Sequence, residues 1–202
     1  LRTPNLNEVQ SLIEIGDGAI SMITIAPELE GALDVISYLS KSDVLPAIGH
    51  SAGNYDDALK AVDAGAALVT HFSNGMSKLR DGEKTFATAL LYESSIPLEL
   101  IIDGHHVSKE DIATIADRAS DRIILVTDAM AAAGQPDGNY MIGLLEVEVV
   151  DGTARLKSNG ALAGSTLIMN KAVDNARNFG ISDAIIENAA RVLPQKLLDR
   201  TR

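Results

Sequence analysis

One pattern constrains the fold of this chain more than any other: a short apolar run that leads into a polar side chain recurs along the sequence. The run 123–126 is followed by Asp128, and three earlier runs lead into His50, His71 and His106. Short bounded apolar runs are typical of parallel strands that are buried on both faces. Because the carboxyl ends of parallel strands meet at one edge of a sheet, we interpret the four side chains as one site built from successive strand ends.

Apolar runs alternate with helical patterns five times, at a spacing of roughly 20–30 residues, which predicts parallel strands joined by crossover helices. Two architectures fit, an open doubly wound sheet and a (β/α)8 barrel. A barrel places its chemistry at the ends of several strands, whereas an open sheet usually carries a glycine-rich phosphate loop at one switch point. Neither GxGxxG nor GxxxxGKS/T occurs in the sequence. The predicted class is therefore α/β, a TIM-type barrel that is incomplete here, with about five of eight strands.

Capping and turn signals give approximate element boundaries. Thr3-Pro4 is expected to begin the first helix, and Asn54 with Asp57 to begin a later one. Asp151-Gly152 is a strong two-residue turn signal, so residues 144–150 and 153–156 are predicted to form a β-hairpin after the last parallel strand. Further elements are expected as a strand at 19–26 and as helices at about 30–40, 86–94, 165–179 and 182–193 and from residue 108 onward.

The composition excludes several classes of protein. A formal net charge of −11 argues against a nucleic-acid or anionic-membrane partner, since either needs a clustered basic surface. The chain has no cysteine, so any metal must be held by His, Asp, Glu and water. No apolar run reaches the length of a membrane span, and none has the pattern of a signal peptide. A soluble cytoplasmic protein is the expectation.

The polar residues at the strand ends suit metal-assisted hydrolysis. A lone histidine is more often structural than a ligand, but the equivalent placement of His50 and His71 favours a shared divalent ion such as zinc. Such an ion makes a nucleophile from water at neutral pH. Asp128 could take a proton from that water and return it to the leaving group. The alternative is that Asp128 caps a helix after its strand.

Several other residues are candidates for substrate or metal binding. His106 is a candidate substrate contact or polariser, and one of the adjacent pair His105 and His106 is expected to face away from the site. Arg80 is either a clamp for an anion or a solvated loop charge. Residues 162–165 would offer backbone amides at a helix start to a polar substrate group. Glu28 is either a third metal ligand or a support near a helix start.

Six motifs occur in order from about residue 3 to about residue 198. Each is weak by itself, but together they closely resemble the N-acetylglucosamine-6-phosphate deacetylase family of the amidohydrolase superfamily. The motifs are Thr24-Ile-Ala-Pro-Glu28, Gly49-His-Ser51, Thr70-His-Phe-Ser-Asn-Gly-Met76, Asp103-Gly-His-His-Val107, Leu125-Val-Thr-Asp-Ala129 and Leu162-Ala-Gly-Ser-Thr-Leu167.

The resemblance implies a metal-dependent hydrolase barrel that converts N-acetylglucosamine 6-phosphate to glucosamine 6-phosphate and acetate, with zinc as the expected ion. It implies that His50 and His71 are metal ligands and that Asp128 is the catalytic acid/base. It further implies a homodimer, because the family's phosphate-binding arginine can reach the neighbouring subunit's site. The residues that it assigns to substrate binding are Asn74, Gly75, Arg80, His106, Leu162, Ala163 and Gly164.

This sequence departs from the family's pattern at several points. Gly75 stands where alanine is usual, and the Gly49–Gly53 motif differs in its last two residues. The family's third metal ligand, a glutamate on an earlier strand, has no counterpart, and neither have the first three barrel strands or the small β-sandwich. We therefore expect residues 1–202 to form a partial catalytic barrel domain that is inactive by itself.

Two competing functions stay open at this point. The chain could be another amidohydrolase that acts on a different N-acyl sugar or on a cyclic amide. It could also be a non-catalytic sugar-phosphate-binding remnant, since the ligand glutamate is missing. The presence of all the other candidate residues favours the deacetylase.

Overall fold

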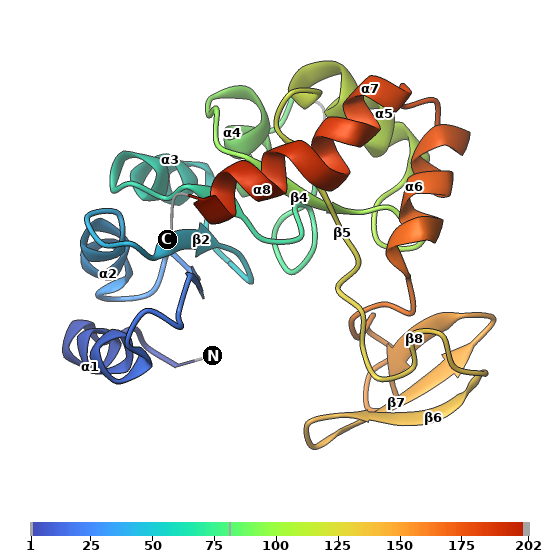
Figure 1. Ribbon diagram of the computed structural model, residues 1–202, viewed down its shortest axis with the longest axis horizontal. Coiled ribbons are helices and arrows are strands. Elements are labelled where there is room, and N and C mark those ends of the chain that lie inside the picture. The colour runs from blue at the N-terminus through green and yellow to red at the C-terminus, as the bar shows by residue number, and fades with distance from the viewer. Residues whose placement is uncertain (1, 81, 200–202) are drawn as a thin grey trace.

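The computed structural model of the chain describes residues 2–80 and 82–199, which form helices and two separate β-sheets (Figure 1). The larger sheet has five parallel strands in the order β1-β2-β3-β4-β5. These strands are Met22–Ile25, Leu45–Ile48, Leu68–Val69, Leu98–Ile101 and Ile123–Val126. The order follows the sequence and lacks the reversal that defines a doubly wound sheet. The α/β class and the five parallel strands are confirmed, and closure into a barrel stays a prediction.

Helices that connect successive strands pack together with one face of this sheet. Their buried side chains and those of the strands form the main core, in which Ile36, Phe86 and Ile112 are fully buried. The four crossover helices are α2 Ala32–Leu39, α3 Tyr55–Asp63, α4 Phe86–Tyr92 and α5 Lys109–Ala119. Asn54 and Asp57 form the capping box that begins α3, as predicted.

The first helix begins later than predicted. Helix α1 spans Leu6–Gly16, and its cap is Asn5, whose side chain accepts a hydrogen bond from the backbone N–H of Glu8 at 3.0 Å. The expected start at Thr3-Pro4 was wrong because Asn5 supplies the capping oxygen instead.

The C-terminal helices are shared between the two faces of the sheet: Ala176 and Ile186 of the earlier ones join the main core, and the last one lies against the other face. They are α6 Met169–Asn178, α7 Asp183–Glu187, a π-helical turn Asn188–Val192 and α8 Leu193–Leu198. Leu193 and Leu197 of this last helix pack with Leu45, Leu68 and Ile124, and Figure 1 shows α8 crossing the sheet. The helix predicted at 182–193 therefore continues to residue 198, with Pro194 in the first turn of α8, where its missing N–H is tolerated.

A small antiparallel sheet projects away from the parallel sheet (Figure 1). It contains β6 Gly138–Ile142, β7 Leu145–Val150 and β8 Thr153–Leu156. The predicted hairpin is confirmed: Asp151 and Gly152 have φ of 48° and 73°, the left-handed pair that a tight two-residue turn requires. Strand β6 was not predicted. Among the described residues, no helix is both long and apolar enough to span a lipid bilayer.

Candidate active site

Three candidate residues occupy the same position relative to their strands. His50, His71 and Asp128 each lie two residues after the end of β2, β3 or β5. Each also has a left-handed backbone, with φ of 50°, 29° and 49° respectively. Non-glycine residues seldom adopt this conformation, and it concentrates at functional sites. The parallel sheet thus delivers three chemically competent side chains to one edge through the same local bend.

The two histidine rings face each other through their Nε2 atoms. The Nε2 atoms of His50 and His71 are 2.8 Å apart, and the rings are perpendicular, with centroids 4.4 Å apart. The Nδ1 of His71 lies 3.2 Å from the backbone carbonyl oxygen of Asn74. Because a carbonyl only accepts, Nδ1 of His71 carries the proton and its Nε2 is left with a lone pair.

The environment keeps His50 neutral. Burial lowers the pKa of His50, the electrostatic influence of the adjacent His71 imidazole lowers it further, and the nearby carboxylate of Asp128 opposes the shift. This also shows that Asp128 is close enough to His50 to be felt electrostatically. A neutral imidazole is the form that binds metals.

The histidine pair fits part of a metal site. Two lone pairs directed at each other repel unless a proton or a cation lies between them, and imidazole nitrogen suits zinc and similar divalent ions. However, the described residues contain no group of three or more His, Asp or Glu side chains placed to hold a metal ion. The pair therefore supplies two donors of a set that needs at least one more.

Glu28 supports the loop after β2. Its carboxylate accepts hydrogen bonds from the Ser51 hydroxyl at 2.6 Å and from the backbone N–H of Ala52 at 2.7 Å. Both oxygens are engaged next to His50, which agrees with the supporting interpretation of Glu28 and leaves neither oxygen free of a partner.

Glu99 on β4 supports His71 in a similar way and was not expected from the sequence. Its carboxylate accepts the backbone N–H of His71 at 3.3 Å. Burial raises the pKa of Glu99, the hydrogen bond from His71 lowers it, and the charge of Asp128 adds to the rise.

Asn74 and Gly75 lie against the histidine pair. The backbone carbonyl oxygen of Asn74 accepts the hydrogen bond from Nδ1 of His71. The side-chain amide of Asn74 donates a hydrogen bond to the carbonyl oxygen of Phe72 at 3.2 Å. Gly75 has φ of 60°, and a Cβ added there would lie 3.1 Å from Nδ1 of His50. The departure from the usual alanine therefore lets the loop approach the His50 ring closely.

The two adjacent histidines after β4 differ sharply in exposure. His106 is buried and its Nδ1 lies 2.6 Å from the carboxylate of Asp103. His105 is exposed, with Nε2 at 3.3 Å from the hydroxyl of Thr153. Asp103 itself lies two residues after β4, the position that His50, His71 and Asp128 occupy after their strands. No role was predicted for Asp103, although its place directly after the apolar run was a usable signal.

No role was predicted for Lys78 from the sequence either. Its ammonium group contacts the backbone carbonyl of Ser73 and lies 3.4 Å from both the side-chain oxygen of Asn74 and the carbonyl of His106. It thus joins the loops after β3 and β4. Partial burial lowers the pKa of Lys78, and the charge of Asp111 partly offsets this.

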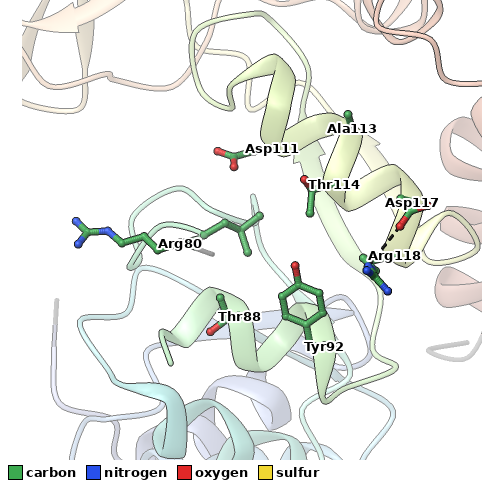
Figure 2. A pocket seen from close by; sticks show the side chains of 9 residues that line it. Arg80, Thr88, Tyr92, Asp111, Ala113, Thr114, Asp117 and Arg118 are labelled. Atoms are coloured by element: carbon green, nitrogen blue, oxygen red, sulfur yellow. Dashed lines mark ion pairs between the residues drawn. The ribbon is translucent and has the colours of Figure 1, made fainter. Parts of the chain in front are cut away.

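Arg80 is exposed and lines a cleft between two helices. It forms an ion pair with Glu83 at 3.5 Å, and its side chain is 66% exposed. Figure 2 shows its guanidinium extending away from the other labelled residues of a cleft of about 540 Å³ between α4 and α5. The cleft is lined by Leu79, Arg80, Thr88, Tyr92, Asp111, Ala113, Thr114, Asp117 and Arg118. The substrate-binding role of Arg80 stays a prediction.

The segment Leu162–Gly164 does not begin a helix, so this part of the prediction was wrong. Helix α6 begins at Met169, because the preceding residues pair with other strands. The N–H of Ala163 donates to the carbonyl of Ala154 at 3.1 Å, and Ser165 exchanges backbone hydrogen bonds with Asp128 and Met130 at 2.7 and 2.8 Å. Leu162 forms a β-bridge with Arg155.

Gly164 allows this segment to pass close to the strand end. A Cβ at Gly164 would lie 3.0 Å from the carbonyl oxygen of Asp128. The segment therefore holds the backbone of Asp128 in place.

No protein-family model matches the chain. A relative described as putative N-acetylgalactosamine-6-phosphate deacetylase from Escherichia coli K12 is 40% identical over 129 residues, which cover 63% of this chain and 77% of that protein. The chain belongs to the family of N-acetylhexosamine-6-phosphate deacetylases. N-acetylgalactosamine-6-phosphate deacetylase from Escherichia coli O157:H7 is 38% identical over 198 residues, 98% of this chain and 52% of the relative.

Solved structures of the deacetylase family share the fold. A mutant of N-acetyl-D-glucosamine-6-phosphate deacetylase from Mycobacterium smegmatis, in complex with N-acetyl-D-glucosamine-6-phosphate, is 36% identical and superposes with a TM-score of 0.91. The alignment covers 98% of this chain and 54% of that structure. The chain therefore spans about half the length of these two full-length family members.

Proposed function

We propose that this protein is a metal-dependent hydrolase of amino-sugar catabolism that converts N-acetylglucosamine 6-phosphate to glucosamine 6-phosphate and acetate. The observation that carries the proposal is the convergence of the His50 and His71 Nε2 atoms at 2.8 Å beside Asp128, in a chain of this family. We further propose that the five-stranded row is part of a (β/α)8 barrel and that residues 1–202 are part of its catalytic domain. The sequential strand order supports this.

In this proposal His50 and His71 hold a divalent ion, for which zinc is the best match to two imidazole donors. When bound, such an ion would lower the pKa of water to about 7 and would polarise the carbonyl of the acetyl group. The chain's own contribution is to keep His50 neutral and to aim both imidazoles at one point.

Asp128 moves the proton in this proposal. Its carboxylate is exposed and makes no hydrogen bond to any described residue, so it is free to accept a proton from the attacking water. As the carbon–nitrogen bond of the acetamide breaks, the same carboxyl returns that proton to the departing amine nitrogen. The products are then acetate and the amino sugar phosphate, with Asp128 ionised as before.

The substrate is held by groups on the neighbouring loops. His106 and Asn74 are placed to contact the sugar, with Gly75 and residues Leu162–Gly164 shaping the backbone around His50 and Asp128. Lys78 and Arg80 are the candidate cations for the phosphate group. The Arg80 side chain is exposed, which fits the further proposal that it serves the site of a second subunit in a homodimer.

A second substrate deserves the same test, because relatives named for the galactosamine epimer are among the similar proteins. N-acetylgalactosamine 6-phosphate differs only in the configuration of one hydroxyl group. The loops after β3 and β4 are the parts that would discriminate between the two sugars.

The test is acetate release by the native, metal-loaded protein from each of the two sugar phosphates. Asp128→Asn should reduce the rate by about 100- to 10,000-fold, as loss of a general base does. Asp151→Asn is the matched control, because Asp151 is also a left-handed aspartate but lies in the hairpin turn. Sugar-phosphate binding without any metal-dependent acetate release would instead identify a binding protein.

A further inference from the structure

The pair Asp103 and His106 forms a second polar centre beside the histidine pair. Asp103 lies at the strand-end position after β4, but its carboxylate turns toward its own loop. One oxygen accepts the backbone N–H groups of His105 at 2.8 Å and His106 at 2.9 Å. The other lies 2.6 Å from Nδ1 of the His106 ring.

The His106 residue is held at three of its atoms. Asp103 binds the ring Nδ1 and the backbone N–H, and the ammonium group of Lys78 lies 3.4 Å from the backbone carbonyl. The side chains of Asp103 and His106 are only 11% and 6% exposed. An imidazole tethered in this way has one orientation.

The tethers leave one ring atom for other chemistry. A carboxylate in contact with Nδ1 can only accept, so the proton must lie on Nδ1. Nε2 of His106 makes no hydrogen bond to any residue in the ranges 2–80 and 82–199. Burial by itself raises the pKa of Asp103, but the hydrogen bonds from His106 and His105 outweigh it and hold that pKa below its usual value.

We propose that Asp103 is a positioning residue that keeps the proton of His106 on Nδ1 and so presents Nε2 to the bound sugar phosphate. The second half of this statement rests on the proposed function. Nε2 can then accept a hydrogen bond from a substrate O–H or N–H group. When Nε2 takes up a proton, the adjacent carboxylate stabilises the resulting imidazolium, as in the buried aspartate–histidine pairs of hydrolytic triads.

The Asp103→Asn variant tests the proposal by reversing the proton's position. The remaining amide oxygen can keep the two backbone N–H donors, which places the NH₂ group against Nδ1 of His106. An NH₂ group donates, so Nδ1 must accept and the proton moves to Nε2. The substitution changes the tautomer while preserving the loop's size and shape.

The readout is the ¹⁵N NMR spectrum of the histidine-labelled protein at alkaline pH, where the imidazole is neutral. A His106→Gln variant assigns the resonances. We expect the Nδ1–H tautomer of His106 in the parent and the Nε2–H tautomer in Asp103→Asn. The Nε2–H tautomer in the parent overturns the proposal without any variant, so a poorly folded variant does not leave it undecided.

Asp137→Asn is the matched control for simple loop bracing. Asp137 also accepts two backbone N–H groups, those of Asp151 at 2.5 Å and Gly152 at 3.1 Å, but its carboxylate contacts no imidazole. It should leave the His106 resonances unchanged. A change in the His106 tautomer in Asp137→Asn would show that loss of any loop-bracing carboxylate moves the proton. The specific role proposed for Asp103 would then be wrong.

Binding of glucosamine 6-phosphate separates this inference from the proposed function. By calorimetry, Asp103→Asn should weaken binding by about 10- to 100-fold, the usual effect of losing a hydrogen bond to a charged or strongly polarised group. Equal affinity in parent and variant overturns the claim that Nε2 meets the ligand. If neither protein binds while the tautomer moves as expected, the proposed function fails and the role of Asp103 in fixing the tautomer stands.

Discussion

Replacing Asp128 by glycine should stabilise the fold relative to replacing it by alanine, which is the reverse of the usual order. Asp128 has φ of 49°, and its side chain is exposed and makes no hydrogen bond to the described residues. Either substitution therefore removes few favourable contacts. The difference in the free energy of unfolding between the two variants therefore measures the strain of the left-handed backbone at residue 128.

The magnitude follows from two opposing terms. A left-handed backbone costs a residue with a Cβ about 1–2 kcal/mol, which glycine avoids. Glycine normally loses roughly 0.5–1 kcal/mol to alanine through backbone entropy. The steric term is larger, so Asp128→Gly should be more stable than Asp128→Ala by about 0.5–1 kcal/mol. Both variants should lose the proposed deacetylase activity, whichever of them is the more stable.

Urea unfolding of the two variants measures this difference, and two sites serve as controls. The same pair at Asp151, with φ of 48°, should show the same order. Ala113→Gly, at an exposed position inside α5, should instead be destabilising by about 1 kcal/mol. If Asp128→Ala were as stable as Asp128→Gly or more so, the backbone at the strand end would not be strained and the reasoning would be refuted.

Three further perturbations test the surroundings of the site. Glu28→Ala removes a carboxylate that accepts two loop hydrogen bonds, so the free energy of unfolding in urea should fall by about 2–3 kcal/mol, and a loss below about 0.5 kcal/mol would contradict the supporting role. The pKa of Asp103 is lower in the folded protein than in the unfolded chain, so the ionised carboxylate stabilises the fold at any pH above the unfolded-state pKa. This stabilisation disappears as the pH falls through the folded-state pKa. Asp103→Asn should therefore flatten the stability curve below about pH 4, and a curve as steep as the parent's would contradict this. Lys78→Met should weaken calorimetric binding of glucosamine 6-phosphate to this chain more than Arg80→Met does, because the Lys78 ammonium contacts Asn74 whereas Arg80 is exposed and paired with Glu83. The opposite ranking would restore Arg80 as the main phosphate contact.

Much of the fold could be predicted because its signals are local. Alternating apolar runs and helical patterns identified the five parallel strands, and Asp151-Gly152 identified the hairpin turn. Strand β6 was missed because Gly138 and Asn139 disfavour strands, and only pairing with β7 along five residues imposes the conformation. The start of α6 was misplaced for a similar reason, since Ser165 pairs with Asp128 across a long stretch of sequence.

The sequence predicted which residues form the candidate site better than it predicted their conformation. The strand-end rule located His50, His71 and Asp128, but not their left-handed backbones, which are uncommon for any non-glycine residue even though Asp and His adopt them more often than most. After β4 the same rule leads to Asp103, whereas the chemistry of the residue type drew attention to His106. The contact between the two shows that both criteria were needed.

Zinc titration of the protein tests the central claim most directly, namely that His50 and His71 converge on one metal ion. With ¹⁵N-labelled histidine, we expect about one equivalent of zinc to shift the Nε2 resonances of His50 and His71 together and to leave His105 unchanged. His50→Gln should abolish both shifts. If zinc moved neither histidine, or moved His71 equally in the His50→Gln variant, the paired metal site and the deacetylase mechanism built on it would be wrong.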